Sequence, residues 1–319
     1  MAQIRPLNAG GCTFRKIMKG IGFTVNQEDT STYYLNLPAE IMAFISSNLD
    51  EGINGLVGIS ITVMANGFKF NQPGLISKFL EVNASNLTAC SPFPAKCVLE
   101  TLKGLSMDKE YFKKIGRLLL IAKGSWPDIT YAINYLPCFS LGPTLAPWDV
   151  LLHLIDYLQF TSNEGIFILR QTETSIFCCV DTNRSTHGFI LFHRDNPIAW
   201  QSKWQTMVAV SMAQSKYLAL SFAAKECLWI SHVFAPIMRT PISTLMSDNK
   251  TEIVIATDSI SRKQTCHLIR EFNVINEYIV IRKIALNWVS TQEKLADIMT
   301  IILGHIALRH ITVSIIHCC

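Results

Sequence analysis

The chain has 319 residues, of which 49% are apolar, and this is enough to bury a sizeable core in two or three compact units. Its formal net charge is +4, from 28 basic and 24 acidic residues, so charge alone does not predict nucleic-acid binding. Ten cysteines are too few for a disulfide scaffold and lack the paired spacing of a zinc site, which indicates reduced thiols in a cytosolic or nuclear protein.

Apolar stretches along the chain are short. Charges or prolines interrupt each of them before about 18 residues, and the N-terminus lacks the apolar core of a signal peptide. We therefore expect no membrane-spanning segment. The most apolar stretch, 301–319, carries three histidines and an arginine, and we interpret 304–319 as a tail without a specified role.

The first 90 residues indicate a broken α/β segment. A short helix is expected near 14–20, and the Asn66-Gly67 pair between two β-rich runs predicts a hairpin. Pro73-Gly74 then opens a helix that runs to about Val82, and Ser91-Pro92 breaks the chain again. From Lys109 to Phe160 the apolar spacing is helical, with Trp126-Pro127-Asp128 as a helix start.

After Gly165 the apolar pattern changes to that of strands. The expected strands are GIFILRQ, SIFCCVD ending at Asp181, HGFILFHR and PIAWQSK. A helix from about Ser211 to Phe234 follows, and then come a strand EIVIATD ending at Asp258, a helical stretch, a strand IALNWVS and a last helix near Gln292. This order predicts an α/β fold with a mixed sheet covered by helices on both faces.

Three blocks of sequence resemble the C-terminal part of copia-type retrotransposon Pol polyproteins. GLVGISITVMANGFKFNQPGLISKFL is similar to the end of the reverse transcriptase palm and its passage into the thumb. YFKKIGRLLLIAKGSWPDITYAINYLPCFSLGPTLAPWDVLLHLIDYLQFTSNEGI is similar to the connecting helices. PIAWQSKWQTMVAVSMAQSKYLALSFAAKECLWI resembles the centre of the RNase H domain. With weaker flanking matches, the resemblance covers about 14–303.

The resemblance implies four segments. They are a truncated palm and thumb remnant at 1–90, a helical thumb and connection unit at 91–165, an RNase H-like domain with a mixed five-stranded sheet at 166–303, and the tail at 304–319. The family's polymerase site holds an Asp-Asp hairpin that binds two metal ions. The corresponding stretch here reads TYYLNLPAEIMAF, and Asp-Asp occurs nowhere in the chain, so we expect no DNA synthesis.

The resemblance also implies an RNase H site, in which four carboxylates hold two Mg²⁺ ions that cleave the RNA of an RNA–DNA hybrid. By position, Asp181 is the first carboxylate, Asp258 the third and Asp297 the fourth, near the start of a helix whose dipole would keep it ionised. The second should be a glutamate, but the position holds Lys216. An ammonium cannot bind Mg²⁺, so we expect catalysis to suffer severely.

Three interpretations remain open for function. The chain is a degenerate reverse transcriptase and RNase H fragment, a nucleic-acid-binding module without catalysis, or an expressed relic without a ligand. Its expected partner is an RNA–DNA hybrid or another nucleic acid, and no small-molecule substrate is inferred. Trp200, Lys203 and Trp204 lie around a strand end, where they would either contact a nucleic-acid backbone or pack against the sheet.

Overall fold

The protein was analysed as a computed structural model of the whole chain. The structure describes residues 24–25, 33–34, 59–83, 87–94, 97, 99, 108–141, 143–169, 175–183, 186–205, 212–234, 242–250, 253 and 269–316. The expected helix at 14–20 and the stretch that corresponds to the polymerase hairpin, apart from Tyr33–Tyr34, lie outside these ranges. Tyr33–Tyr34 (β2) pairs with Thr24–Val25 (β1).

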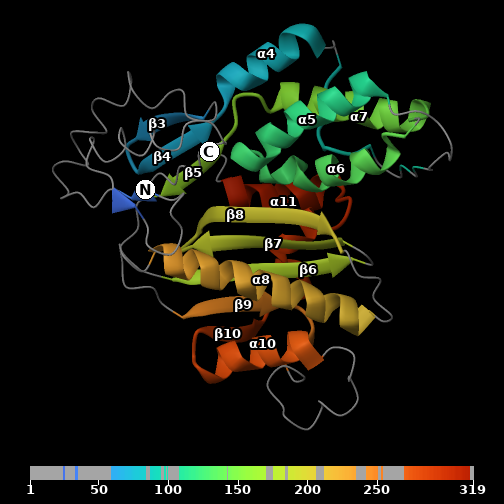
Figure 1. Cartoon of the computed structure of the whole chain (residues 1–319). Helices are drawn as coiled ribbons and strands as arrows, with labels where there is room; N and C mark the ends of the chain where they lie inside the picture. The colour runs from blue at the N-terminus through green and yellow to red at the C-terminus, as the bar shows by residue number, and fades with distance from the viewer. Residues whose placement is uncertain are drawn as a thin grey trace.

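A five-stranded sheet in the order β10-β9-β6-β7-β8 forms the centre of the molecule (Figure 1). Strands β6 (Ile176–Asn183), β7 (Thr186–His193) and β8 (Asn196–Trp204) are antiparallel neighbours. Strands β9 (Ser243–Ser247) and β10 (Ile284–Trp288) extend the sheet in parallel with β6. The sequence-based expectation of a mixed five-stranded sheet is thus confirmed, and its order and directions are those of the RNase H-like fold.

Both faces of this sheet are covered, because its central strands are apolar at successive positions. Cys178 and Val180 of β6 pack against helix α8 (Met212–Phe234), which crosses in front of the sheet in Figure 1. Side chains pointing the other way, such as Cys179 and Phe192, pack against the helical unit. Helix α10 (Ile269–Val280) also packs on α8.

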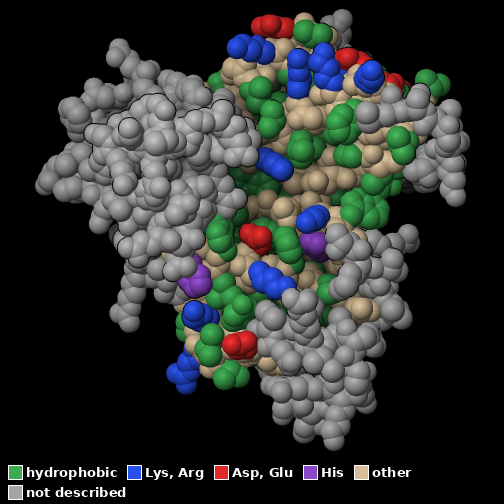
Figure 2. Space-filling model, viewed as in Figure 1, with side chains coloured by type: hydrophobic (Ala, Val, Ile, Leu, Met, Phe, Trp, Pro, Cys, Tyr) green, Lys and Arg blue, Asp and Glu red, His purple; other side chains and the backbone are tan. Residues whose placement is uncertain are grey.

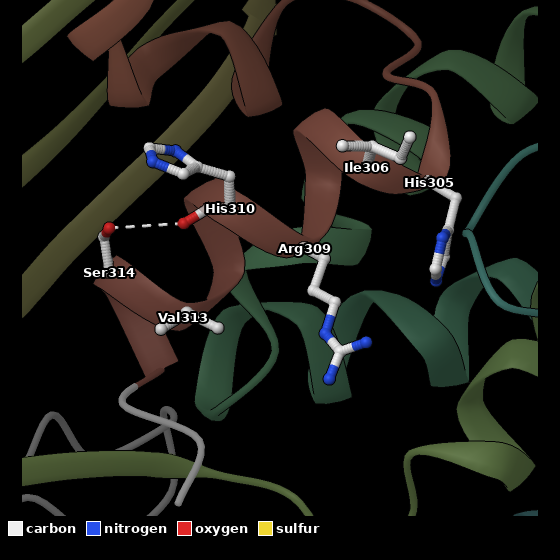
Figure 3. Close-up of a pocket in the computed structure, with 6 residues that line it drawn as sticks. All are labelled: His305, Ile306, Arg309, His310, Val313 and Ser314. Carbon is white, nitrogen blue, oxygen red and sulfur yellow. Dashed lines mark hydrogen bonds between the residues drawn. The ribbon is translucent and has the colours of Figure 1, made fainter.

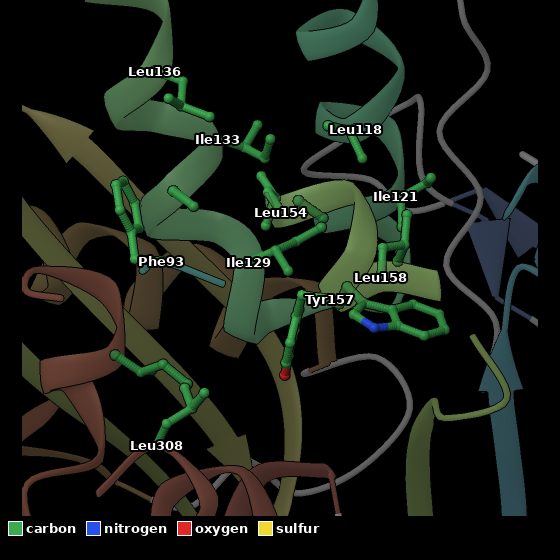
Figure 4. Packing of buried hydrophobic residues seen from close by; sticks show 14 of the residues in the cluster. Phe93, Leu118, Ile121, Ile129, Ile133, Leu136, Leu154, Tyr157, Leu158 and Leu308 are labelled. Carbon is green, nitrogen blue, oxygen red and sulfur yellow. The ribbon is translucent and has the colours of Figure 1, made fainter. Parts of the chain in front are cut away.

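The helical unit contains α5 (Lys109–Gly124), η1 (Pro127–Ile129), α6 (Thr130–Tyr135), η2 (Leu136–Phe139) and α7 (Leu145–Phe160). Asp108 caps α5, because its carboxylate accepts hydrogen bonds from the amides of Glu110 and Tyr111. Figure 4 shows Leu118 and Ile121 of α5 packed with Ile133 of α6 and Leu154 of α7. The helical periodicity predicted for 109–160 is therefore confirmed.

A second sheet, in the order β3-β4-β5, lies beside the helical unit (Figure 1). The predicted hairpin is confirmed by β3 (Ser60–Met64) and β4 (Gly67–Asn71), and α4 (Pro73–Asn83) follows as expected. Strand β5 (Ile166–Leu169) pairs with β4 and not with the five-stranded sheet. A Cβ atom on Gly67 would lie 2.1 Å from the carbonyl oxygen of Ile168, so this pairing requires glycine there.

The C-terminal part differs from the sequence-based expectation. The expected helix near Gln292 is replaced by two short 3₁₀ helices, η5 (Thr291–Glu293) and η6 (Leu295–Met299). The tail contains a helix, α11 (His305–Ile316), whose Leu308 is buried in the main core (Figure 4). In the described part of the chain, no helix is long and apolar enough to span a membrane.

The prediction of a strand at 252–258 is wrong at Ile253, which is the one residue of that range that the structure describes. Ile253 is helical, and its amide donates to the carbonyl of Asn249. The strand that pairs in parallel with β6 is β9, earlier in the chain. Its alternation of Ser, Leu and Ser is a weaker β signal than the β-branched run at 252–258, and tertiary pairing rather than propensity decides the strand.

Candidate active site

Carboxylates meet at the end of the sheet where β6 and β9 terminate. Asp181 lies near the end of β6, and Asp248 follows the last residue of β9 directly. Because β6 and β9 are parallel neighbours, both carboxylates emerge at the same edge. Asp297 reaches this edge from η6.

The absence of a side chain at Gly188 lets η6 approach strand β7 closely. Gly188 pairs with Asp181 across β6 and β7, and a Cβ atom there would lie 2.3 Å from the Cβ of Met299. The missing side chain lets η6 rest on the sheet. This contact brings Thr300 to Asp181, and the Thr300 hydroxyl donates a hydrogen bond to the Asp181 carboxylate.

The ammonium group of Lys294 lies among the three carboxylates. Its Nζ atom is 2.5 Å from Asp181 Oδ1, 2.8 Å from Asp248 Oδ2 and 3.6 Å from Asp297 Oδ1. Lys294 precedes η6 directly and is only 7% exposed. Burial of an ammonium is costly unless it is paired, and here three carboxylates pair with it.

The contact between Lys294 and Asp248 shifts the pKa values of both groups. Burial would lower the pKa of Lys294, but the charges and hydrogen bonds of Asp181 and Asp248 outweigh it and raise the pKa above its usual range. Burial would raise the pKa of Asp248, but the hydrogen bond and charge of Lys294, with those of Lys216, hold it below its usual range. Both groups are therefore charged at neutral pH.

The pKa of Asp297 is raised, whereas we expected a helix dipole to keep this carboxylate ionised. Burial and the negative charge of Asp181 raise its pKa to about 6, although Lys294 acts in the opposite direction. The expected helix dipole is weak here, since η6 is a 3₁₀ helix of five residues and Asp297 is its third. The shift is upward because Lys294 gives its short contacts to Asp181 and Asp248 and is farther from Asp297.

Lys216 faces the same cluster from α8. Its Nζ lies 3.4 Å from Asp248 Oδ1, and it lines a cavity of about 10 Å³ with Asp181 and Asp248. That volume is about one water molecule. Three carboxylates and two ammonium groups leave a net charge of −1 at the site.

The residues present do not fit a pair of Mg²⁺ ions. Magnesium binds carboxylate oxygens at about 2.0–2.1 Å, and a two-metal site needs enough negative charge to offset +4. Here the Lys294 ammonium occupies the position between the carboxylates, and Lys216 stands where the resemblance implies the second carboxylate. Within the described ranges, no three acidic, histidine or cysteine side chains are arranged to hold a metal ion.

Three of the residues proposed from the sequence lie together in the structure, and their predicted role in catalysis stays a prediction. Asp181, Asp297 and Lys216 lie in this site, whereas Asp258 lies outside the described residues. Asp248 and Lys294 were missed. Asp248 follows a short strand with little β signal, and a lysine carries no mark in the sequence of being buried among acids.

A larger hollow lies elsewhere, along α11. It has a volume of about 480 Å³ and is lined by six residues of that one helix, as Figure 3 shows. Its polar side chains are His305, Arg309, His310 and Ser314, and the Ser314 hydroxyl donates to the His310 carbonyl at 3.2 Å. It contains no carboxylate and is separate from the acidic cluster.

On the face seen in Figure 2, the charged side chains of the described residues are dispersed. In the face seen in Figure 2, lysine and arginine side chains gather with acidic ones over α4, α5 and α7, and a few more lie over the sheet and α8. No extended patch of one sign covers the described part of this face.

The fold defines the class of this protein: a sheet with RNase H-like strand order and directions is joined to a helical unit. By sequence the chain is similar to retrovirus-related Pol polyproteins from copia-type transposons. It is 25% identical over 274 residues to the retrovirus-related Pol polyprotein from transposon RE2 of Arabidopsis thaliana. The aligned region covers 82% of this chain and 19% of that protein. The chain thus spans about a fifth of that relative.

A second relative is closer in length. The chain is 29% identical over 191 residues to the uncharacterized mitochondrial protein AtMg00810 of Arabidopsis thaliana, covering 56% of this chain and 79% of that protein. No protein-family model matches the chain.

Solved structures show weak likeness. A foamy viral protease-reverse transcriptase in complex with an RNA/DNA hybrid has a TM-score of 0.46 and 12% identity, over 88% of this chain and 37% of that one. The N-terminal RNase H domain of rv2228c from Mycobacterium tuberculosis, solved as a fusion with maltose binding protein, has a TM-score of 0.31 and 12% identity, over 44% and 99%. The strand order and directions, and not these likenesses, define the fold.

Proposed function

We propose that this chain derives from the reverse transcriptase and RNase H part of a retrotransposon Pol polyprotein, and that its RNase H-like site does not cleave RNA. The ancestral role is supported by the sequence relatives and by the RNase H-like sheet. The ancestral substrate would be an RNA–DNA hybrid, and the ancestral cofactor Mg²⁺.

One observation carries the loss of cleavage: the position of Lys294. Hydrolysis in this fold needs two divalent ions held by carboxylates, one beside the attacking water and one beside the leaving oxygen. The Lys294 ammonium lies within 2.8 Å of both Asp181 and Asp248 and offsets part of their negative charge. A divalent ion at the same place would have to displace it against charge repulsion, and Lys216 adds a second positive charge.

A cleavage assay with a labelled RNA–DNA hybrid and Mg²⁺ tests this proposal. We expect no cleavage by the wild-type chain, and none by Lys216→Glu alone, because Lys294 still occupies the cluster. The double variant Lys216→Glu, Lys294→Gln removes both cations and supplies a fourth carboxylate. It should gain binding of Mg²⁺ or Mn²⁺, measured as a metal-dependent rise in Tm that the wild-type chain lacks.

The control for a contaminating nuclease is Asp181→Asn. Cleavage by the wild-type chain that disappears in Asp181→Asn would overturn the proposal, whereas equal cleavage by both would come from a contaminant and leave the site inactive. Circular dichroism of each variant establishes that it is folded. The wild-type assay decides the proposal even where the double variant does not fold.

A further inference from the structure

A stack of aromatic rings reaches the surface at the end of β8. The indole of Trp204 lies parallel to the ring of Tyr135, with centroids 6.3 Å apart and planes at 11°. Tyr135 in turn stacks on Tyr131 at 5.8 Å and 12°, and both tyrosines contact the buried Phe93. The stack thus fixes the orientation of the indole while 42% of the Trp204 side chain remains exposed.

A lysine accompanies this indole. Lys203 is exposed, its Nζ lies 5.9 Å from the ring centroid of Phe222 on α8, and no described carboxylate pairs with it. Successive residues of a strand point to opposite faces, so Lys203 lies on the α8 face and Trp204 on the α6 face of the same strand end. A ligand that contacts both side chains must therefore be extended and cross the end of β8.

Hydrogen bonds join the end of β8 to the residues beside Asp181 and Lys216. The Gln205 amide donates to the Thr182 hydroxyl at 3.3 Å and to the Ser215 carbonyl at 2.8 Å, and the Ser215 hydroxyl donates to Gln205 Oε1 at 3.0 Å. Each of these residues is next in sequence to Trp204, Asp181 or Lys216. Trp204 also pairs with Thr186, which pairs with Asn183 of β6, so two strand spacings, about 10 Å, separate the Trp204 backbone from the end of β6.

We propose that Trp204 and Lys203 form a binding site for a single nucleic-acid strand that crosses the end of β8, in which a base stacks on the indole and a phosphate further along the strand contacts the ammonium. Stacking is available to every base, so this site accepts RNA and DNA without a sequence preference. A base in a duplex already stacks on its neighbours, so an unpaired strand is the favoured ligand. The proposal goes beyond the loss of cleavage and does not depend on it.

Fluorescence anisotropy of a labelled single strand of about 12 nucleotides tests the site on the full chain, in EDTA so that no metal contributes. We expect Trp204→Ala to weaken binding by about 5- to 100-fold, the range for loss of one stacked base. Trp204→Phe retains a ring and should stay within about threefold of the wild-type affinity. Lys203→Ala should lower the slope of log K against log salt by about 0.7, the value for one phosphate contact on a single strand.

Two variants serve as matched controls. Phe160→Ala removes an aromatic side chain that is 60% exposed at the end of α7, and Lys113→Ala removes an exposed lysine of α5. Neither should change affinity or salt slope beyond the error of measurement. The inference fails if the wild-type chain binds no strand, if Trp204→Ala binds as Phe160→Ala does, or if an RNA–DNA hybrid binds more tightly than the single strand.

Discussion

Two regions of the molecule bury aspartate, and they do so in different ways. At the end of the sheet, Asp181 and Asp248 surround the Lys294 ammonium, and the pKa of Asp248 is held below its usual range. In the helical unit, Asp128 is 3% exposed and accepts a hydrogen bond from the Tyr157 hydroxyl, and no described cation pairs with it. Burial raises the pKa of Asp128 to about 6, although the Tyr157 hydrogen bond lowers it in part.

The difference shows what a buried carboxylate needs in order to stay ionised. A hydroxyl donor offsets part of the cost of burial, whereas a cation in direct contact reverses the direction of the shift. At the end of the sheet, the chain itself thus supplies cations that keep the carboxylates ionised. Substitutions at Lys294 and Asp128 test whether Lys294 provides this stabilisation and whether Asp128 lacks it.

The largest effect is expected for Lys294→Met. The methionine fills similar space but leaves Asp181, Asp248 and Asp297 together without their cation, and breaking a buried ion pair costs about 3–5 kcal/mol. Urea unfolding at pH 7 measures this loss, which should shrink near pH 4 because the carboxylates then take up protons. Lys216→Met, at a more exposed position, should lose less. An unchanged stability at pH 7 would show that Lys294 is not required.

Gly188→Ala should have the next largest effect. Its added methyl group would overlap the Cβ of Met299, and η6 would move away from the sheet, taking Lys294 and Thr300 with it. We expect a loss of about 1–3 kcal/mol in unfolding free energy, as in other overpacked sites. Gly116→Ala is the control, since its Cβ would meet nothing within 4 Å on α5 and should stabilise the helix slightly. Equal stability of the two variants would contradict the close approach of η6.

Asp128→Asn tests the second region through pH. Because the folded pKa of about 6 is above the ordinary value of 3.8, the folded state binds the proton more tightly, and stability falls as pH rises from about 4 to 6. The asparagine variant removes this term. It should be more stable than wild type at pH 7 by on the order of 1–2 kcal/mol and show a smaller slope between pH 4 and 6.

Part of that slope should remain, because the raised pKa of Asp297 has the same sign. Asp149→Asn, an exposed aspartate of α7, is the control and should leave the slope as it is in wild type. A slope in Asp128→Asn as steep as that of wild type would mean that Asp128 is ionised in the folded state at no cost.

The smallest effect is expected for Glu110→Gln. Glu110 forms an ion pair with Lys114 one helical turn away on α5, with an oxygen–nitrogen distance of 3.6 Å, and its side chain is 59% exposed. Water screens such pairs, so the loss in a thermal melt should be about 0.5 kcal/mol or less. A loss as large as that of Lys294→Met would remove the contrast between buried and exposed ion pairs.

Much of the fold could be predicted from periodicity. The strands β6, β7, β8 and β10 and the helices α4, α5, α7 and α8 occur within a few residues of the expected positions. Even there, periodicity does not decide which of two neighbouring apolar residues faces the core: on α5, Tyr111 is buried and Phe112 is 49% exposed. The pairing of β5 could not be predicted, because nothing in Ile166–Leu169 indicates which sheet it joins.

The site was less predictable than the fold. Asp181 and Asp297 could be proposed from their positions in the sequence blocks. Asp248 could not, because the sequence does not indicate which segment pairs with β6. Lys294 could not be recognised, because its role comes from three carboxylates that are 3, 46 and 113 residues away along the chain. Contacts of that range are set by the topology and not by local sequence.

The packing of α11 couples the unfolding of the sheet to that of the helical unit. Ile315 of α11, Leu154 of α7 and Ile190 of β7 belong to a single buried cluster, and the Trp200 indole donates to the Ala122 carbonyl at 2.9 Å across it. A chain whose two principal parts share one interior should unfold in a single cooperative step. Shortening the C-terminus by one helix would therefore weaken the helical unit about 150 residues upstream as well as the sheet beside it.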